Sequence, residues 1–166
     1  MAAKRVVLIP LDGGENSEWA FKWYLKRSKQ PRDFLILLHV VEGTLVTTSK
    51  AGLDEESRAV LCESLNEHLQ TDIKLGRKLL EKFSQMCKEV DLKHKVTVHV
   101  DDKPGDAVIK VAQQYKANLI IMGSRGINKV RRTFLGSTSD HVLHHSAVPV
   151  LLVPAKKRNR PSFTVS

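Results

Sequence analysis

A chain of 166 residues suffices for one domain around a single hydrophobic core and is too short for two domains of ordinary size. Its 42% hydrophobic and 27% charged residues exclude a disordered or collagen-like protein, and no apolar run approaches the roughly 18 residues of a membrane span. The formal net charge is +9, but two acid-free segments carry +4 each and leave +1 for the rest.

The first basic segment lies in one loop and the second in the C-terminal tail. They consist of Arg125, Lys129, Arg131 and Arg132, and of Lys156, Lys157, Arg158 and Arg160. The nearly neutral remainder and the 5% aromatic content argue against a nucleic-acid-binding module, which is the weakest of the functions considered. Two cysteines, Cys62 and Cys87, make neither a disulfide framework nor a zinc site, so we expect a cytoplasmic protein without membrane contact.

Five short apolar runs bounded by turn-forming residues predict β-strands. They cover residues 5–11, 34–41, 95–100, 119–122 and 148–153. Three of them lack polar alternation, which is typical of strands buried on both faces, and the segments between them have helical periodicity. The pattern predicts a single-domain α/β fold of the flavodoxin-like or Rossmann-like kind, with a doubly wound parallel sheet of order 3-2-1-4-5.

Four helices are expected between these strands, over residues 18–27, 61–90, 106–115 and 137–145. The longest has apolar residues every three or four positions, interrupted by Gly76, which the helix tolerates if its backbone packs closely there. The polar connection 42–59 is long, and a lid is one interpretation of it. Residues 1–154 are predicted to form the domain, and residues 155–166 a disordered basic tail.

A glycine-rich segment follows the fourth strand. Gly123, Gly126, Gly136 and Ser137 have the spacing G-x2-G-x9-G-S, and the last two open a helix. Glycines let a ligand approach the backbone, and the first amides of a helix lack intrahelical acceptors and bind anions. Hydroxyls of Ser137, Thr138 and Ser139 and the loop cations would add to a phosphate site.

The ligand crevice of such a sheet lies at the carboxyl ends of the strands, where the winding reverses. Asp12, Val40, Gly123 and Gly136 all fall at this edge, which predicts a nucleotide site. On spacing alone a purely structural interpretation stays open, in which the glycines make a turn and a helix cap. The Walker and G-x-G-x2-G motifs are absent, which weakens kinase-like and dehydrogenase interpretations.

From Val6 to Val153, with this loop, Asp12 and a closing Val148-Pro149-Val150, the chain resembles the universal stress proteins, a family of adenine-nucleotide binders. The resemblance implies ATP or AMP as ligand, with or without Mg²⁺, a role in stress response as a nucleotide-dependent switch, and homodimers joined through the last strand, 148–153. It implies no general enzymatic reaction.

By position, the family's binding residues fall on three parts of this chain. They are Pro10, Leu11 and Asp12 beside base and ribose, Val40 beside adenine, and Met122, Gly123, Arg125, Gly126, Gly136, Ser137 and Thr138 around ribose and phosphates. One departure is Gly14, where the family often has Ser, so a hydroxyl contact is missing there.

Other candidates are weaker. His141, His144 and His145 share one predicted helix, but dipole-favoured histidines near a helix end explain them better than a metal site does. His39 is expected to be a hydrogen-bonded core histidine rather than a base. No nucleophile triad is indicated, so the alternative to a binding protein is a weak ATP hydrolase or nucleotidyl-transferring enzyme.

The final strand and the basic tail indicate two interactions other than nucleotide binding. The apolar final strand, with Val150 to Val153, would lie at a sheet edge, which independently favours a homodimer. The basic tail is compatible with nuclear import as well as with a merely solvated terminus.

Overall fold

The computed structural model describes residues 4–43, 52, 54–124 and 135–156. Within them, strands and helices alternate, and a π-helical turn, η1, follows the first helix. In chain order the elements are β1 (Val6–Pro10), α1 (Glu15–Trp23), η1 (Tyr24–Ser28), β2 (Phe34–Glu42), α2 (Glu55–Glu89), β3 (His94–Asp101), α3 (Pro104–Gln114), β4 (Leu119–Gly123), α4 (Ser137–His145) and β5 (Val150–Val153).

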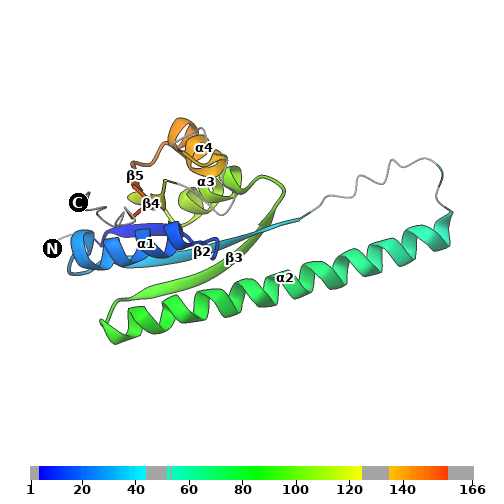
Figure 1. Cartoon of the computed structure of the whole chain (residues 1–166), viewed down its shortest axis with the longest axis horizontal. Coiled ribbons are helices and arrows are strands. Elements are labelled where there is room, and N and C mark those ends of the chain that lie inside the picture. The colour runs from blue at the N-terminus through cyan, green and yellow to red at the C-terminus, as the bar shows by residue number, and fades with distance from the viewer. Residues whose placement is uncertain (1–3, 44–51, 53, 125–134, 157–166) are drawn as a thin grey trace, which may run out of the picture.

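The strands form one parallel sheet in the order β3-β2-β1-β4-β5, which confirms the predicted fold class and strand order (Figure 1). Val7 of β1 pairs with Leu35 of β2 on one side and with Leu119 of β4 on the other. The chain therefore reverses its winding direction between β1 and β4, and a ligand crevice is expected at the carboxyl ends of these two strands.

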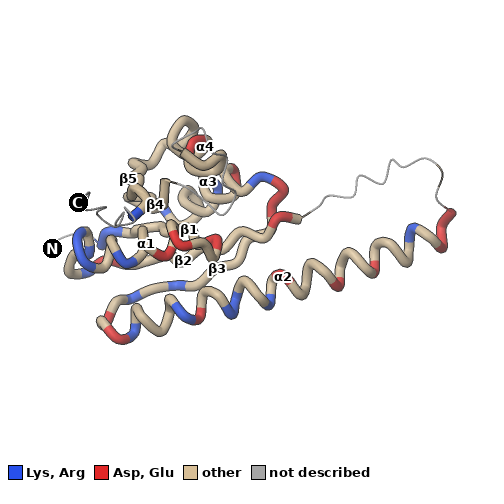
Figure 2. Tube along the Cα trace, viewed as in Figure 1, with Lys and Arg blue, Asp and Glu red and all other residues tan. Residues whose placement is uncertain are grey.

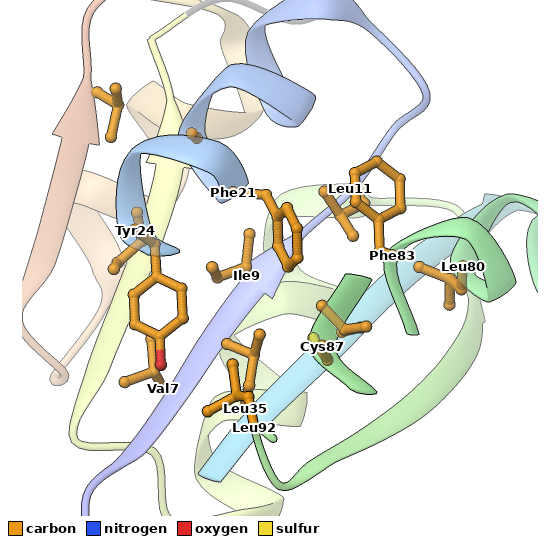
Figure 3. Close-up of a cluster of buried hydrophobic side chains, with 14 residues drawn as sticks. Val7, Ile9, Leu11, Phe21, Tyr24, Leu35, Leu80, Phe83, Cys87 and Leu92 are labelled. Atoms are coloured by element: carbon orange, nitrogen blue, oxygen red, sulfur yellow. The ribbon is translucent and has the colours of Figure 1, made fainter. Parts of the chain in front are cut away.

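Helices cover both faces of the sheet, with α1 and α2 on one and α3 and α4 on the other (Figure 1). Successive residues of β1 serve the two sides: Ile9 is buried with α1 and α2, and Leu8 with α3 and α4. Figure 3 shows the first of these cores, in which the rings of Phe21 and Phe83 meet edge to face at 5.1 Å. This double burial explains why the strand sequences lack polar alternation.

The buried carboxylate of Asp33 links the residues that precede β1 and β2 to Tyr24 of η1. Asp33 accepts hydrogen bonds from Arg5 Nε at 2.8 Å, from Tyr24 Oη at 2.8 Å and from the Gln30 amide at 2.9 Å. Burial alone would raise the pKa of Asp33, but the hydrogen bonds from Arg5, Gln30 and Tyr24 outweigh it and hold this pKa below its usual value. The network lies at the edge of the sheet opposite the crevice, so its role is stability.

Helix α4 has the predicted bounds, whereas α1 and α2 begin earlier than predicted. Helix α2 begins at Glu55 because the Asp54 side chain caps it, accepting from the Ser57 amide at 2.7 Å. The expectation of one long connection over 42–59 is therefore wrong for its last residues. The lid hypothesis falls mainly on residues 44–51 and 53, outside the described residues, as does the tail from residue 157.

Gly76 confirms the close packing expected of a glycine within the long helix. It is buried, and a Cβ atom there would lie 2.5 Å from Cδ2 of His39 on β2. Along the described segments, no helix is long and apolar enough to cross a membrane.

Candidate functional site

A cavity of about 310 Å³ opens at the carboxyl ends of β1, β2 and β4, at the predicted switch point. This volume is at the lower end of the range found for small-molecule sites. Nine of the predicted site residues line it together: Pro10, Leu11, Asp12, Val40, Met122, Gly123, Gly136, Ser137 and Thr138. The other two, Arg125 and Gly126, lie outside the described residues.

The turn after β1 presents the carboxylate of Asp12. Gly13 has φ +82°, a left-handed conformation that favours glycine, and it turns the chain into α1. Oδ1 of Asp12 accepts from the Gly14 amide at 2.8 Å and from Oγ of Ser17 at 2.7 Å. Both bonds fall on one oxygen, so Oδ2 has no partner in the described part of the chain and remains for a ligand hydroxyl or a cation.

Ser17 was missed by the sequence analysis, although it also lines the cavity and is 7% exposed. By the family resemblance, Gly14 lacks a hydroxyl that this turn often carries. Ser17 places a hydroxyl one helical turn later, and the hydrogen bond from this hydroxyl to Oδ1 fixes the orientation of the Asp12 carboxylate. The signal in the sequence is the spacing of five residues between Asp12 and Ser17, which the start of a helix brings within hydrogen-bonding distance.

The end of β2 offers unpaired backbone groups to the cavity. The carbonyl of Leu38 accepts from the Leu11 amide at 2.7 Å, on the side of β2 that faces β1. Because strand residues two apart point their backbone groups to the same side, those of Val40 also face β1. The last residue pair between β1 and β2 is Pro10 with Leu38, so β1 ends before it reaches Val40. The N–H and C=O of Val40 therefore lie beyond the end of β1. They are suited to hydrogen bonds with the edge of a base.

His39 is half-buried beside Val40, and its Nδ1 lies 2.7 Å from the Leu11 carbonyl, to which it donates. The other edge of the ring packs against Gly76 of α2. This agrees with the expectation of a hydrogen-bonded histidine, and it also makes His39 part of the cavity wall.

Gly123 ends β4 where no side chain fits. A Cβ atom at this position would lie 2.7 Å from the backbone oxygen of Asn16 at the start of α1. The glycine thus allows α1 to approach β4 and keeps the floor of the crevice open. Its predicted role in contacting ribose or phosphate stays a prediction.

The start of α4 differs in detail from the prediction. The Gly136 amide donates to the Ser124 carbonyl at 2.8 Å. Oγ of Ser139, which is 3% exposed, donates to the Gly136 carbonyl at 3.0 Å. Both groups thus close the turn onto α4 in this structure, and the phosphate contact expected of Gly136 stays a prediction.

Ser137 and Thr138 keep the anion-binding potential of this helix end. Their backbone amides precede the first intrahelical hydrogen bond, in which the Asp140 amide donates to the Gly136 carbonyl at 2.9 Å. Ser137 is exposed and Thr138 half-buried at the cavity. The positive end of the α4 dipole therefore faces the cavity, with two hydroxyls beside it.

The histidines of α4 contact neighbouring groups of the protein. His141 Nε2 lies 2.7 Å from Oδ1 of Asp106 on α3, and its ring stacks on that of His145 at 4.2 Å between centroids. The described parts of the chain contain no group of three or more His, Cys, Asp or Glu residues arranged to hold a metal ion.

Chemically, the cavity joins an anion-binding helix end, a carboxylate with one free oxygen and an exposed strand end. The set matches the three parts of a nucleotide: phosphates, ribose and base. It also contains apolar walls from Leu11, Val108 and Met122 that suit a planar ring.

Comparison with known proteins agrees with this geometry. The family model described as "Universal stress protein family" matches residues 4–154. The universal stress protein YxiE of Bacillus subtilis is 28% identical over 149 residues, which are 89% of this chain and 97% of that protein.

Solved structures share the whole fold. MJ0577 of Methanocaldococcus jannaschii superposes with a TM-score of 0.77 and 25% identity, over 95% of this chain and 100% of that one. A family member from Arabidopsis thaliana, solved with AMP bound, has a TM-score of 0.65 and 19% identity over 96% and 97% of the two chains. At that identity the second likeness concerns the fold alone.

Proposed function

Because this chain belongs to the universal stress protein family, we propose that it binds an adenine nucleotide, ATP or AMP, in the crevice between β1 and β4. The adenine would lie against Val40, the ribose against Asp12, and the phosphates against the amides and hydroxyls of Ser137 and Thr138. The protein would act in the cytoplasm as a nucleotide-dependent switch in stress response, and it would change its partners according to the bound nucleotide.

One observation carries the proposal: the amino end of α4 and the free oxygen of Asp12 line a single cavity of about 310 Å³. A helix end favours anions and a carboxylate favours hydroxyls, so the two together suit a phosphorylated sugar better than a plain anion or an apolar molecule. Supporting it, one solved relative has AMP bound and another universal stress protein was solved in complex with cAMP.

Magnesium would enter with the ATP phosphates. Mg²⁺ prefers oxygen ligands and keeps several waters, so one protein carboxylate beside the phosphates is a sufficient donor set. Asp12 is the residue of this chain that would hold it. The metal would neutralise phosphate charge, and no protein-only metal site is required.

Calorimetric titration of the full chain with ATP and with AMP, each with and without Mg²⁺, tests the proposal. We expect saturable binding, and for Asp12→Ala an affinity lower by about 10- to 100-fold, as for loss of a hydrogen bond to a charged group. Asp72→Ala, an equal change at an exposed position of α2, should bind like the unmodified chain.

Absence of heat, together with an unchanged melting temperature at millimolar nucleotide, would refute nucleotide binding here. The alternative, an ATP hydrolase, predicts phosphate release at several turnovers per second that disappears in Asp12→Ala. We expect no turnover at that rate.

The proposal includes a homodimer formed through β5. Among the residues that the structure describes, this strand pairs only with β4, and it therefore presents a free edge at one end of the sheet. A free edge strand is covered or paired in most proteins, and pairing with a second copy would satisfy its outward N–H and C=O groups.

A further inference from the structure

The amino-terminal half of α2 projects beyond the sheet (Figure 1). The helix runs over 35 residues, but its first buried residue is Gly76. We define residues 55–72 as the arm. At 1.5 Å per residue it is about 27 Å long, and it makes up about half of the helix. Isolated helices of this length are marginal in water, so a projecting arm calls for a packing partner.

An apolar stripe follows the arm. Leu61, Leu65 and Leu69 recur every four residues on the helix face that continues through Gly76 to Leu80. Leu80 is fully buried on the sheet, whereas Leu61 is 38% exposed. The stripe thus has the character of a core-facing surface, yet within the described residues it lies past the sheet that would cover it.

The two halves of α2 carry opposite charge (Figure 2). The arm has five acidic residues and one arginine, for a net charge of 1 − 5 = −4; they are Glu55, Glu56, Glu63, Glu67, Asp72 and Arg58. The rest of the helix, residues 73–89, has five cations and two acids, for 5 − 2 = +3; they are Lys74, Arg77, Lys78, Lys82, Lys88, Glu81 and Glu89.

A groove of about 910 Å³ runs between this basic half of α2 and β3. Its helix side carries four cations and one acid, and its strand side presents alternate valines. The lining includes Lys74, Arg77, Lys78, Glu81 and Lys88 from the helix and Val96, Val98 and Val100 from the strand. Val100 is 40% exposed, and β3 is the edge of the sheet opposite β5. The groove is therefore apolar at its floor and basic along its wall.

We propose that the arm of one copy lies in the α2–β3 groove of a second copy, and the reverse, as a twofold-symmetric pair. The arm leucines would cover the β3 valines, and the arm acids would face the basic wall. Residues 73–88, the helix side of the groove, are 16 residues long, close to the 18 of the arm. Antiparallel pairing of α2 with itself brings each acidic half beside a basic half, which a parallel pairing does not.

The register of side chains fits this arrangement. Glu67, Lys74 and Lys78 lie on one side of α2, since spacings of 7 and 11 residues are close to two and three helical turns. That side borders the groove, where Lys74 and Lys78 are part of the lining. With residues 55–72 laid antiparallel along residues 73–88 of the other copy, residue 67 comes level with residues 76–78. Glu67 of each copy therefore approaches Lys78 of the other, and the twofold axis makes this contact twice.

Sedimentation equilibrium of the full chain at about 100 μM tests the arrangement. We expect Leu65→Glu combined with Leu69→Glu to lower the average mass by at least half relative to the unmodified chain. Val60→Glu is the matched control: Val60 is also in the arm and is 63% exposed, but it points away from the stripe. It should keep the original mass. Circular dichroism verifies that all variants stay folded.

Charge reversal gives a second test that leaves the leucines in place. Lys78→Glu alone should lower the dimer affinity at least tenfold, and Glu67→Lys added to the same chain should restore most of it, because the symmetric contact then pairs the reversed charges. Equal masses for the unmodified chain and the double leucine variant would overturn the proposal, as would equal losses in the double leucine variant and Val60→Glu, or no restoration by Glu67→Lys.

Thiol labelling distinguishes a second copy from any other partner that could cover the leucine stripe of the arm. Cys62 is exposed on the arm, whereas Cys87 is buried, and burial raises the pKa of its thiol to about 12. Cys62 should be protected at high protein concentration and become reactive on dilution. Protection of Cys62 that does not change with concentration would place the stripe against its own chain and contradict the proposal.

Discussion

At the scale of single residues, Ser17 acts on the proposed ligand through Asp12. Its hydroxyl bonds to Oδ1 of Asp12, so it fixes which carboxylate oxygen faces the cavity. We expect Ser17→Ala to weaken nucleotide binding by about 3- to 10-fold, the magnitude of one hydrogen bond. Calorimetry should find no further loss when Ser17→Ala is added to Asp12→Ala, because the hydroxyl then has no carboxylate to orient. Independent, multiplicative losses would contradict a positioning role.

The lowered pKa of Asp33 predicts how the stability of the fold depends on pH. Because its pKa is lower in the folded chain than in the unfolded one, its contribution is complete above the unfolded value of about 4 and is lost as the pH falls through the folded value. Asp33→Asn should cost about 3 kcal/mol at pH 7, since it leaves the Arg5 guanidinium without its buried partner.

Urea unfolding at pH 7 and at pH 3 measures this effect. The difference between Asp33→Asn and the unmodified chain should narrow at pH 3. A difference that is the same at both pH values would mean that the charge of Asp33 does not stabilise the fold.

At the scale of elements, the packing of α2 on β2 through Gly76 connects the helix to the cavity wall. Gly76→Ala should lower the melting temperature, because the added methyl group meets a His39 ring that the Leu11 carbonyl holds in place. In a His39→Ala background the same change should instead stabilise the chain by up to about 1 kcal/mol, the helix propensity of Ala over Gly. Thermal unfolding of the four chains tests the reversal of sign, and a destabilisation of equal size in both backgrounds would contradict it.

The strands could be predicted from sequence more fully than the helix ends. Runs such as 34–41 are apolar throughout because both faces of β2 are buried, and that signal is local. The start of α2 was missed because the first turns of the arm are polar, and a stripe of leucines indicates a helix without indicating where it begins. The cap by Asp54 was the available signal.

The sequence predicts where the site residues lie in the fold, but not which of their polar groups are hydrogen-bonded within the protein. The edge of the sheet that carries Asp12, Val40 and Gly123 follows from strand order alone. The hydrogen bond from the Gly136 amide to the Ser124 carbonyl joins residues twelve positions apart, and the sequence does not indicate such a contact.

At the scale of the whole molecule, the sheet has two edges and each is proposed to meet a second copy, β5 by strand pairing and β3 beneath the arm. The carbonyls of Pro149 and Val153 accept from β4, so the backbone groups of residues 150 and 152 point to the free edge. Leu152→Pro removes one outward N–H while sparing the bonds to β4.

If both contacts form, the two edges link copies into larger assemblies, Leu152→Pro and the double leucine variant of the arm should each leave a dimer, and their combination should sediment as a monomer of 18.7 kDa. The two losses should be independent, because the edges lie at opposite ends of the sheet. A combined variant no smaller than the arm variant alone would mean that β5 forms no contact between copies, and nucleotide binding measured on the same proteins would be unaffected by that outcome.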